Sequence, residues 1–264
     1  MNYKEFEKLA KEYKTIPVYK RVLADLLTPI SAYMRLEINS NYAFILESVE
    51  KGAGYGRYSF IGRNPQMIVR CQNNITQIKE NNNWQDDPSP FLDVLRKIQK
   101  QYKAPKLSGI PHFTGGLVGY MGYESIIWVE DIPIYEKDDM QCPDAIFMLF
   151  HDLIAFDHFQ NQIILFSNVQ IKDGMDRKKA YKDAHARIDA MGEDLHTDID
   201  YQTPSRQQQS ELSSNFTKAE FEDAVLRAKE HIKAGDIFQL VLSQRFHRQT
   251  SADPLTLYRA LRSI

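Results

Sequence analysis

The sequence predicts an α+β protein, with a largely antiparallel β-sheet or sandwich and flanking helices, followed by a helix–strand–helix unit. Three observations predict this fold class. Short apolar segments, separated by turn residues, recur over much of residues 41–169. Amphipathic segments with helix start or stop signals lie at 90–102, 175–191 and 217–235. A polar stretch at 193–214 contains few core-forming residues and predicts a linker between two parts.

Composition excludes several classes of function. The 264 residues include 33 basic and 35 acidic side chains, and this balance gives no electrostatic reason to bind nucleic acid or an anionic membrane. The amino terminus alternates in charge and no apolar run approaches membrane-spanning length, which predicts a soluble, cytoplasmic protein. Cys71 and Cys142 lie far apart, a pattern typical of reduced thiols that offers no metal-ligand spacing.

Strands are expected in several segments of the first part. Residues 26–36 alternate between apolar and polar side chains, and residues 41–49 form an apolar run interrupted by Glu47. A buried carboxylate needs a partner, so Glu47 is either an edge-strand residue facing solvent or a member of a polar site. Further short strands are expected within residues 57–80 and 144–169.

Two helices are expected to flank these strands. The first begins at Pro90 behind a Ser89 cap, and the second covers residues 175–191 and ends at Gly192. The buried stripe of the first helix is expected to consist of Phe91, Leu95, Ile98 and Tyr102.

Residues 113–124 form the glycine-rich segment of the chain. A phosphate-binding loop is one interpretation, but the Gly-x-Gly-x-x-Gly pattern and a terminal Lys-Ser/Thr are missing from this segment. Gly116, Gly119 and Gly122 recur at every third position, which favours close packing against a neighbouring backbone.

The segment from Thr217 to Phe246 predicts a helix followed by a strand. Thr217 and Glu220 form a capping box at the helix start, and Gly235 supplies its end. After Asp236 the hydrophobic period becomes two, which places the apolar side chains Phe238, Leu240, Leu242 and Phe246 on a predicted core face. The opposite face, which includes Gln239, belongs either to a half-exposed strand or to a wet cavity.

A last helix is predicted from its Asp253 cap and from Pro254 at its first position. The strand before it would need more partners than about fifty residues supply. We therefore expect the chain to be a fragment of a longer protein.

Several of these motifs resemble one enzyme family. Residues 235–246, with the helices on either side, are similar to the opening of the chorismate-binding domain of anthranilate synthase component I. Residues 28–33, 45–48 and 56–62, and the glycine-rich segment, resemble the amino-terminal domain of the same family. The resemblance implies an amino-terminal domain at 1–192, a linker at 193–214 and an incomplete catalytic domain at 215–264.

The resemblance implies a lyase of tryptophan biosynthesis that converts chorismate and ammonia to anthranilate and pyruvate. It also implies Mg²⁺ as cofactor, with its ligands and the catalytic residues beyond residue 264, and a glutamine amidotransferase partner, component II, that supplies ammonia. Gln239 matches a position near the substrate, where water-using relatives carry a lysine base. Because an amide does not titrate, Gln239 favours an ammonia-using enzyme.

The same resemblance assigns a tryptophan effector site to Leu46, Glu47 and Ser48, with the second half of the site beyond residue 264. A hydroxyl beside a carboxylate suits the polar groups of an amino acid. Two alternatives stay open: aminodeoxychorismate synthase component I, of the folate pathway, and a non-enzymatic tryptophan-binding module. The chain by itself is expected to be inactive.

Overall fold

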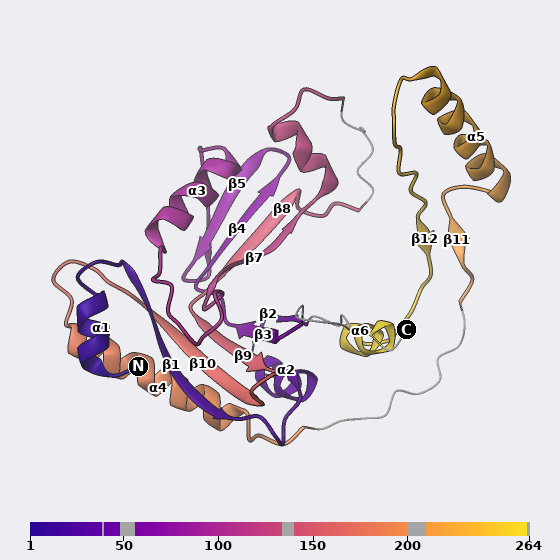
Figure 1. Ribbon diagram of the computed structural model, residues 1–264. Helices are drawn as coiled ribbons and strands as arrows, with labels where there is room; N and C mark the ends of the chain where they lie inside the picture. Colours follow the sequence, from indigo (N-terminus) through magenta and orange to yellow (C-terminus); the bar gives the residue numbers. More distant parts are fainter. Residues whose placement is uncertain (39, 48–55, 134–139, 200–209, 263–264) are drawn as a thin grey trace. The chain divides into compact units, whose positions relative to one another are not determined.

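The computed structural model describes residues 1–264 except 39, 48–55, 134–139, 200–209 and 263–264 (Figure 1). The chain divides into two compact units, Met1–Ile199 and Asp200–Ile264. In chain order, the first unit contains α1 (Tyr3–Leu9), β1 (Thr15–Leu23), α2 (Pro29–Glu37), β2 (Ala43–Leu46), β3 (Tyr58–Arg63), β4 (Met67–Gln72), β5 (Ile75–Glu80), β6 (Asn83–Asp87), α3 (Phe91–Gln101), β7 (Gly116–Met121), the 3-10 helix η1 (Tyr123–Trp128), β8 (Ala145–Phe150), β9 (Asp152–Asp157), β10 (Gln162–Gln170) and α4 (Arg177–Asp194).

The first sheet has the strand order β1-β10-β9-β3-β2, with all neighbours antiparallel. Alternate residues of β10 enter two different cores, because successive side chains of a strand point to opposite faces. Ile163 and Leu165 join a cluster with α1, α2 and α4, whereas Ile164 and Phe166 join a cluster on the other face. Both faces of the sheet are therefore covered.

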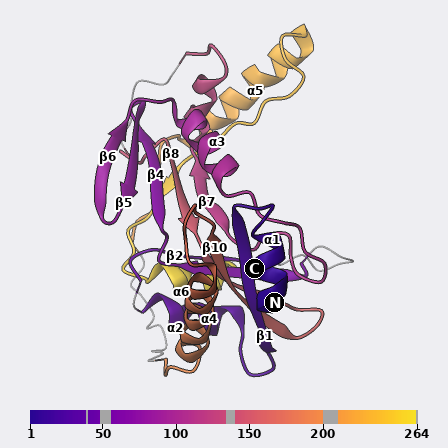
Figure 2. The same ribbon diagram turned by 90° about the vertical axis from the view of Figure 1, so that its left-hand side faces the viewer.

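The second sheet has the order β6-β5-β4-β8-β7 and is also antiparallel. Helix α3 covers one face of it, as Figures 1 and 2 show, and buries Phe91, Val94 and Ile98 against strands β4 and β8. Phe150 of β8 joins the cluster of Ile164 and Phe166, so the two sheets share a core. The predicted α+β class with largely antiparallel sheets is confirmed.

The predicted strand at 26–36 is wrong, because residues Pro29–Glu37 form helix α2. The amide of Ser31 donates to Thr28 Oγ1 at 3.2 Å and the amide of Thr28 donates to Ser31 Oγ at 3.0 Å, which closes a capping box. Ala32 and Leu36, four residues apart, are buried against the first sheet. Capping and the four-residue spacing outweigh the two-residue alternation.

Two helix boundaries also differ from the predicted ones. Helix α3 begins at Phe91, with Pro90 as its cap residue and without a side-chain cap from Ser89. Helix α4 continues through Gly192 to Asp194. Its last turn is held by tertiary contacts, since Asp194 pairs with Arg63 of β3 and Leu195 is buried. Glycine is a weak helix former but does not by itself end a helix. Here the tertiary packing of the last turn outweighs the cost of Gly192.

The second unit contains β11 (Ser213–Ser214), α5 (Lys218–Ala234), β12 (Phe246–His247) and α6 (Pro254–Leu261). The predicted limits of α5 are confirmed, with the Thr217–Glu220 capping box at its start and Gly235 at φ 84° at its end. The predicted strand and core face after Asp236 are wrong. Residues 236–245 form neither helix nor strand, and Phe238 is 94% exposed. Within the described part of this unit, only β11 and β12 pair, so no wider sheet covers these side chains.

The described residues 193–199 and 210–214 belong to the linker that the sequence predicts at 193–214, and its residues 200–209 lie outside the described part. Helix α4 overlaps the first two residues of that range. No helix in the described part of the chain is long and apolar enough to cross a membrane.

Candidate functional site

The residues proposed for the effector site lie at the end of edge strand β2. Leu46 pairs with Phe60 of β3 and its side chain is 47% exposed. Glu47 follows directly and is half-buried, and Ser48 lies outside the described residues. Helix α2 packs on both β2 and β3. Leu46 and Glu47 thus lie at the partly accessible end of an edge strand.

The ring of Phe60 packs on the loop that precedes β7. Its centroid lies 5.3 Å from that of Phe113, in an edge-to-face arrangement. Phe44, also on β2, packs edge-to-face on Phe150 at 4.7 Å. Such aromatic pairs add directional contacts to the burial of apolar area. They fix the strand that carries Leu46 against the shared core.

An ion pair holds the beginning of β3. Arg57 Nη2 donates to Asp157 Oδ2 at 2.6 Å, and Arg57 Nε donates to Asp157 Oδ1 at 3.0 Å. The Asp157 side chain is fully buried, whereas the Arg57 side chain is 42% exposed. The guanidinium also lies 4.9 Å from the ring centroid of Tyr58. This bidentate geometry ties the start of β3 to the end of β9.

The environment of Asp157 decides its protonation. Burial raises the pKa of the Asp157 carboxyl, but hydrogen bonds from Arg57 and from the amides of Gln160 and Phe159 outweigh burial. The resulting pKa lies below the usual value for aspartate. Asp157 is therefore a carboxylate at neutral pH, and its partner arrangement is that of a structural ion pair.

A hydroxyl–imidazole pair lies next to this ion pair. Ser59 Oγ is 2.7 Å from His158 Nε2, a distance that would suit a nucleophile and its base. The serine residue is only 1% exposed, however, so a substrate has no access to its hydroxyl. The pair is better explained as a hydrogen bond that fixes β3 against the end of β9.

Gln239 lies in the second unit and is exposed. It belongs to the stretch 236–245, which has no helix or strand. The structure does not bring Gln239 together with Leu46 or Glu47 within one compact unit.

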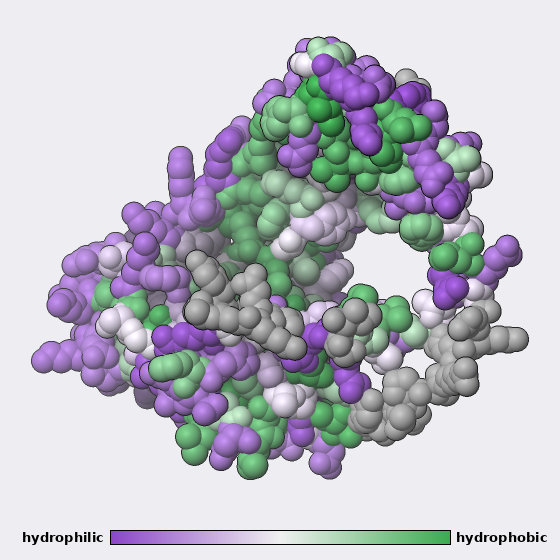
Figure 3. All heavy atoms as spheres, turned by 45° about the vertical axis from the view of Figure 1, so that its right-hand side comes forward, coloured by the Kyte–Doolittle hydropathy of each residue, from purple (hydrophilic) through white to green (hydrophobic). Residues whose placement is uncertain are grey.

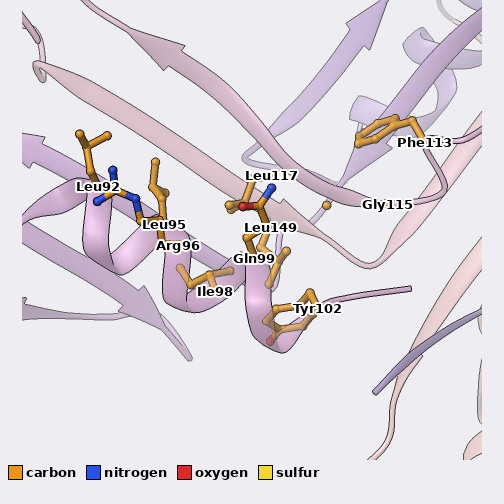
Figure 4. Close-up of a pocket in the computed structure, with 11 residues that line it drawn as sticks. Leu92, Leu95, Arg96, Ile98, Gln99, Tyr102, Phe113, Gly115, Leu117 and Leu149 are labelled. Carbon is orange, nitrogen blue, oxygen red and sulfur yellow. The ribbon is translucent and has the colours of Figure 1, made fainter. Parts of the chain in front are cut away.

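The first unit also contains a cavity of about 450 Å³ between α3 and β7, named here the α3–β7 cavity. Apolar side chains from the helix and the sheet face each other across it, as Figure 4 shows. Its apolar lining includes Leu92, Leu95, Ile98, Leu117 and Leu149. Arg96 and Gln99 contribute polar groups from α3, and Phe113 and Gly115 line the cavity from the loop before β7.

The sequence analysis did not single out two residues that organise this part of the structure, Arg57 and Asp157. A signal for Asp157 was present, because a carboxylate ends the apolar run Leu153–Asp157 and would need a partner if buried. Nothing local identifies that partner, since Arg57 is 100 residues away. Among the described residues, no group of three or more His, Cys, Asp or Glu side chains could hold a metal ion.

Three comparisons relate this chain to known proteins. A family model described as chorismate binding enzyme matches residues 41–264. Anthranilate synthase component 1 of Acetivibrio thermocellus is 37% identical over 269 residues, covering 98% of this chain and 54% of that protein. Anthranilate synthase component 1 of Synechocystis sp. is 35% identical, and the match covers 99% of this chain and 54% of that protein. The chain thus spans about half the length of the curated relatives it matches.

A solved structure has the same fold. The crystal structure of anthranilate synthase component I from Streptococcus pneumoniae aligns with a TM-score of 0.65 at 26% sequence identity, covering 92% of this chain and 52% of that chain. The chain is therefore similar to anthranilate synthase component I in its fold as well as in its sequence. The family model matches far more than half of the chain, and we conclude that the chain belongs to the chorismate binding enzyme family.

Proposed function

We propose that a polypeptide of the relatives' length that contains this chain acts as component I of an anthranilate synthase, converting chorismate and ammonia to anthranilate and pyruvate. The observation that carries this proposal is the family match over residues 41–264, together with relatives named anthranilate synthase component 1 across nearly the whole chain. The reaction is the first step of tryptophan biosynthesis. We place the protein in the cytoplasm.

The proposed reaction needs two further components. A divalent Mg²⁺ ion would stabilise the charge that develops as the ring hydroxyl of chorismate leaves. A glutamine amidotransferase subunit, component II, would supply ammonia. Both are proposals that follow from the resemblance to component I, and the metal ligands are expected beyond residue 264.

Tryptophan is the proposed feedback effector, bound in part by Leu46, Glu47 and Ser48. Two features support this assignment: Leu46 presents a half-exposed apolar surface, and the next residue, Glu47, is half-buried and carries a carboxylate. An apolar wall next to a carboxylate suits an indole ring and an ammonium group. Gln239 is proposed to lie near the substrate in the complete catalytic domain.

The activity is tested with the longer polypeptide, chorismate, ammonium and Mg²⁺. Anthranilate fluorescence should appear with time and should disappear when EDTA removes the metal. Mass spectrometry of the product separates anthranilate from aminodeoxychorismate, the product of the alternative enzyme. Absence of both products would reject an ammonia-using synthase. The 264-residue chain alone is expected to form neither product.

Feedback inhibition has its own test. In the longer polypeptide, tryptophan should inhibit anthranilate formation, and Ser48→Phe should relieve inhibition with little change in kcat, because the added ring occupies the proposed effector site. Ser108→Phe is the matched control, since Ser108 is exposed and distant in sequence. Equal inhibition of both variants would contradict the assigned site. Tryptophan binding without any synthase activity would instead favour the non-enzymatic module.

A further inference from the structure

We propose that the α3–β7 cavity binds a small amphiphilic anion, with an aromatic or aliphatic body and one carboxylate. This inference concerns a site separate from Leu46, Glu47 and Gln239, none of which lines the cavity. It does not depend on the proposed enzymatic function. Three features carry it: the apolar lining, the preformed wall and the charge at the helix.

The lining and the volume suit an apolar body. Leu92 and Leu95 of α3 are half-buried and face Leu117 of β7, so their side chains form an incompletely covered apolar surface. About 450 Å³ lies within the range of sites for small molecules. Transfer of an aromatic ring into such a site removes apolar area from water on both sides.

The wall opposite α3 is tied to the neighbouring strands by hydrogen bonds and close backbone contacts. Asn168 Nδ2 donates to the carbonyl oxygen of Thr114 at 2.7 Å and to that of His151 at 2.8 Å. Gly115 has φ 150°, and a Cβ there would collide with Asn168 Nδ2 and lie 2.9 Å from the carbonyl oxygen of Phe150. Residues 114–115 are thus held close to β8 and β10. A preformed wall lowers the entropic cost of binding.

The charge around the helix favours an anion. Residues 91–106 contain five cationic side chains and the single carboxylate of Asp93; the cations are Arg96, Lys97, Lys100, Lys103 and Lys106. Arg96 lines the cavity, and its Nη1 donates to Asp93 Oδ1 at 2.7 Å. That bond uses one N–H of the guanidinium, and its other N–H groups can donate to a second carboxylate. Gln99 adds an amide donor from the same helix.

Calorimetry with two matched probes tests the site in the 264-residue chain. The probes are 3-phenylpropionate and the uncharged 3-phenylpropan-1-ol, which share the same ring and chain length. Leu95→Trp fills the cavity from α3, and Leu117→Phe fills it from β7, so either variant can serve if the other fails to fold. Arg96→Gln removes the proposed anion contact. Lys97→Gln is the control, because it removes the same charge from the next residue, which does not line the cavity.

We expect 3-phenylpropionate to bind and the alcohol to bind about two- to fivefold more weakly, because Arg96 is largely exposed and its contact with the carboxylate is screened. Arg96→Gln should remove this preference, and Lys97→Gln should retain it. A folded cavity-filling variant should lose binding of both probes. Circular dichroism establishes which variants are folded.

Three results would overturn the inference. Binding that survives unchanged in a folded cavity-filling variant would place the probe elsewhere, for example on the exposed apolar side chains of the second unit, such as Phe238 and Val241. If 3-phenylpropionate gives no heat of binding at concentrations up to about 10 mM, the cavity does not bind this class of anion. Equal affinity for acid and alcohol, with binding lost in a filled variant, would reject the anion preference.

Discussion

Asp157 shows how a single buried charge is accommodated in this fold. The first unit buries its side chain completely, and Arg57 and two backbone amides supply the compensating donors. Removal of one partner of such a pair leaves an unsatisfied group, which costs more than the loss of an exposed pair. The ion pair therefore stabilises the contact between β3 and β9.

We expect Asp157→Asn to lower the free energy of unfolding by about 2 kcal/mol at pH 7, an estimate reduced because Arg57 is partly exposed. The control is Asp93→Asn, which breaks an exposed pair with Arg96 and should cost less than about 0.5 kcal/mol. Urea unfolding measures both. Equal losses would show that burial of Asp157 has no energetic consequence.

The lowered pKa of Asp157 also predicts an acid dependence. Because the folded pKa lies below the unfolded one, the contribution to stability is present above the unfolded pKa, about 3.9, and is lost as the pH falls toward the folded pKa. Wild-type stability should therefore fall more steeply than that of Asp157→Asn between about pH 4 and pH 2. Parallel slopes in urea unfolding would contradict this prediction.

His151 predicts a second pH dependence, at higher pH. Burial lowers its pKa, and Nε2 has no hydrogen-bond partner among the described residues. Since the unfolded state binds the proton more tightly, stability is present above about pH 6.5 and is lost as the pH falls toward the lowered folded pKa. His151→Gln should reduce this loss, measured by thermal unfolding at pH 7 and pH 5. His185 has a lowered pKa as well, so part of the slope should remain.

At the scale of elements, two glycines with opposite roles test the packing. A Cβ at Gly119 of β7 would collide with the carbonyl oxygen of Ile146 and lie 2.7 Å from Phe147 Cα. In contrast, a Cβ at Gly192, within α4, would make an ordinary contact with Leu165 Cδ1 at 3.7 Å. The first position requires glycine for space, and the second does not.

We expect Gly119→Ala to destabilise the first unit by about 2 kcal/mol or more, because backbone must move to admit the methyl group. Gly192→Ala should stabilise it by about 0.5–1 kcal/mol, since alanine favours a helix and reduces the entropy of the unfolded chain. Thermal unfolding of both variants shows whether each substitution stabilises or destabilises the first unit. A stabilising Gly119→Ala would show that the β7–β8 contact is looser than in the structure.

At the scale of the whole molecule, the two units differ in how many apolar side chains they bury. Strand β10 places Ile163, Ile164, Leu165 and Phe166 at 0–1% exposure, whereas α5 has no buried residue. Most helical stability in proteins comes from the packing of an apolar face, and α5 buries no such face. Figure 3 shows apolar side chains, in green, among the polar ones at the surface.

Hydrogen exchange should therefore separate the two units. Amides of α5 are expected to exchange far faster than those of β10, which should open only on global unfolding. Mass spectrometry of the 264-residue chain measures both, and a chain of residues 1–199 serves as the control, in which β10 should keep its protection. Equal protection of α5 and β10 would contradict the difference in burial.

Elements whose signals are local can be predicted from the sequence alone. Thr217, Glu220 and Gly235 specify the limits of α5 through contacts within a few residues, and short apolar runs bounded by turn residues specify the strands between residues 145 and 170. The family resemblance also rests on contiguous motifs, so it could be stated before the structure. For the candidate effector site, the sequence proposed Leu46, Glu47 and Ser48, and the structure describes the first two at the end of an edge strand.

The tertiary structure alone accounts for the remaining features, because they depend on residues far apart in sequence. It placed β3 and β4 in different sheets, although both had been expected within one run of strands at 57–80. It also continued α4 past Gly192 through the contact of Asp194 with Arg63, and paired Asp157 with Arg57. Hydrophobic period and capping depend on residues that are close along the chain. Strand pairing and burial depend on which distant surfaces pack together and exclude water, and no local pattern specifies that.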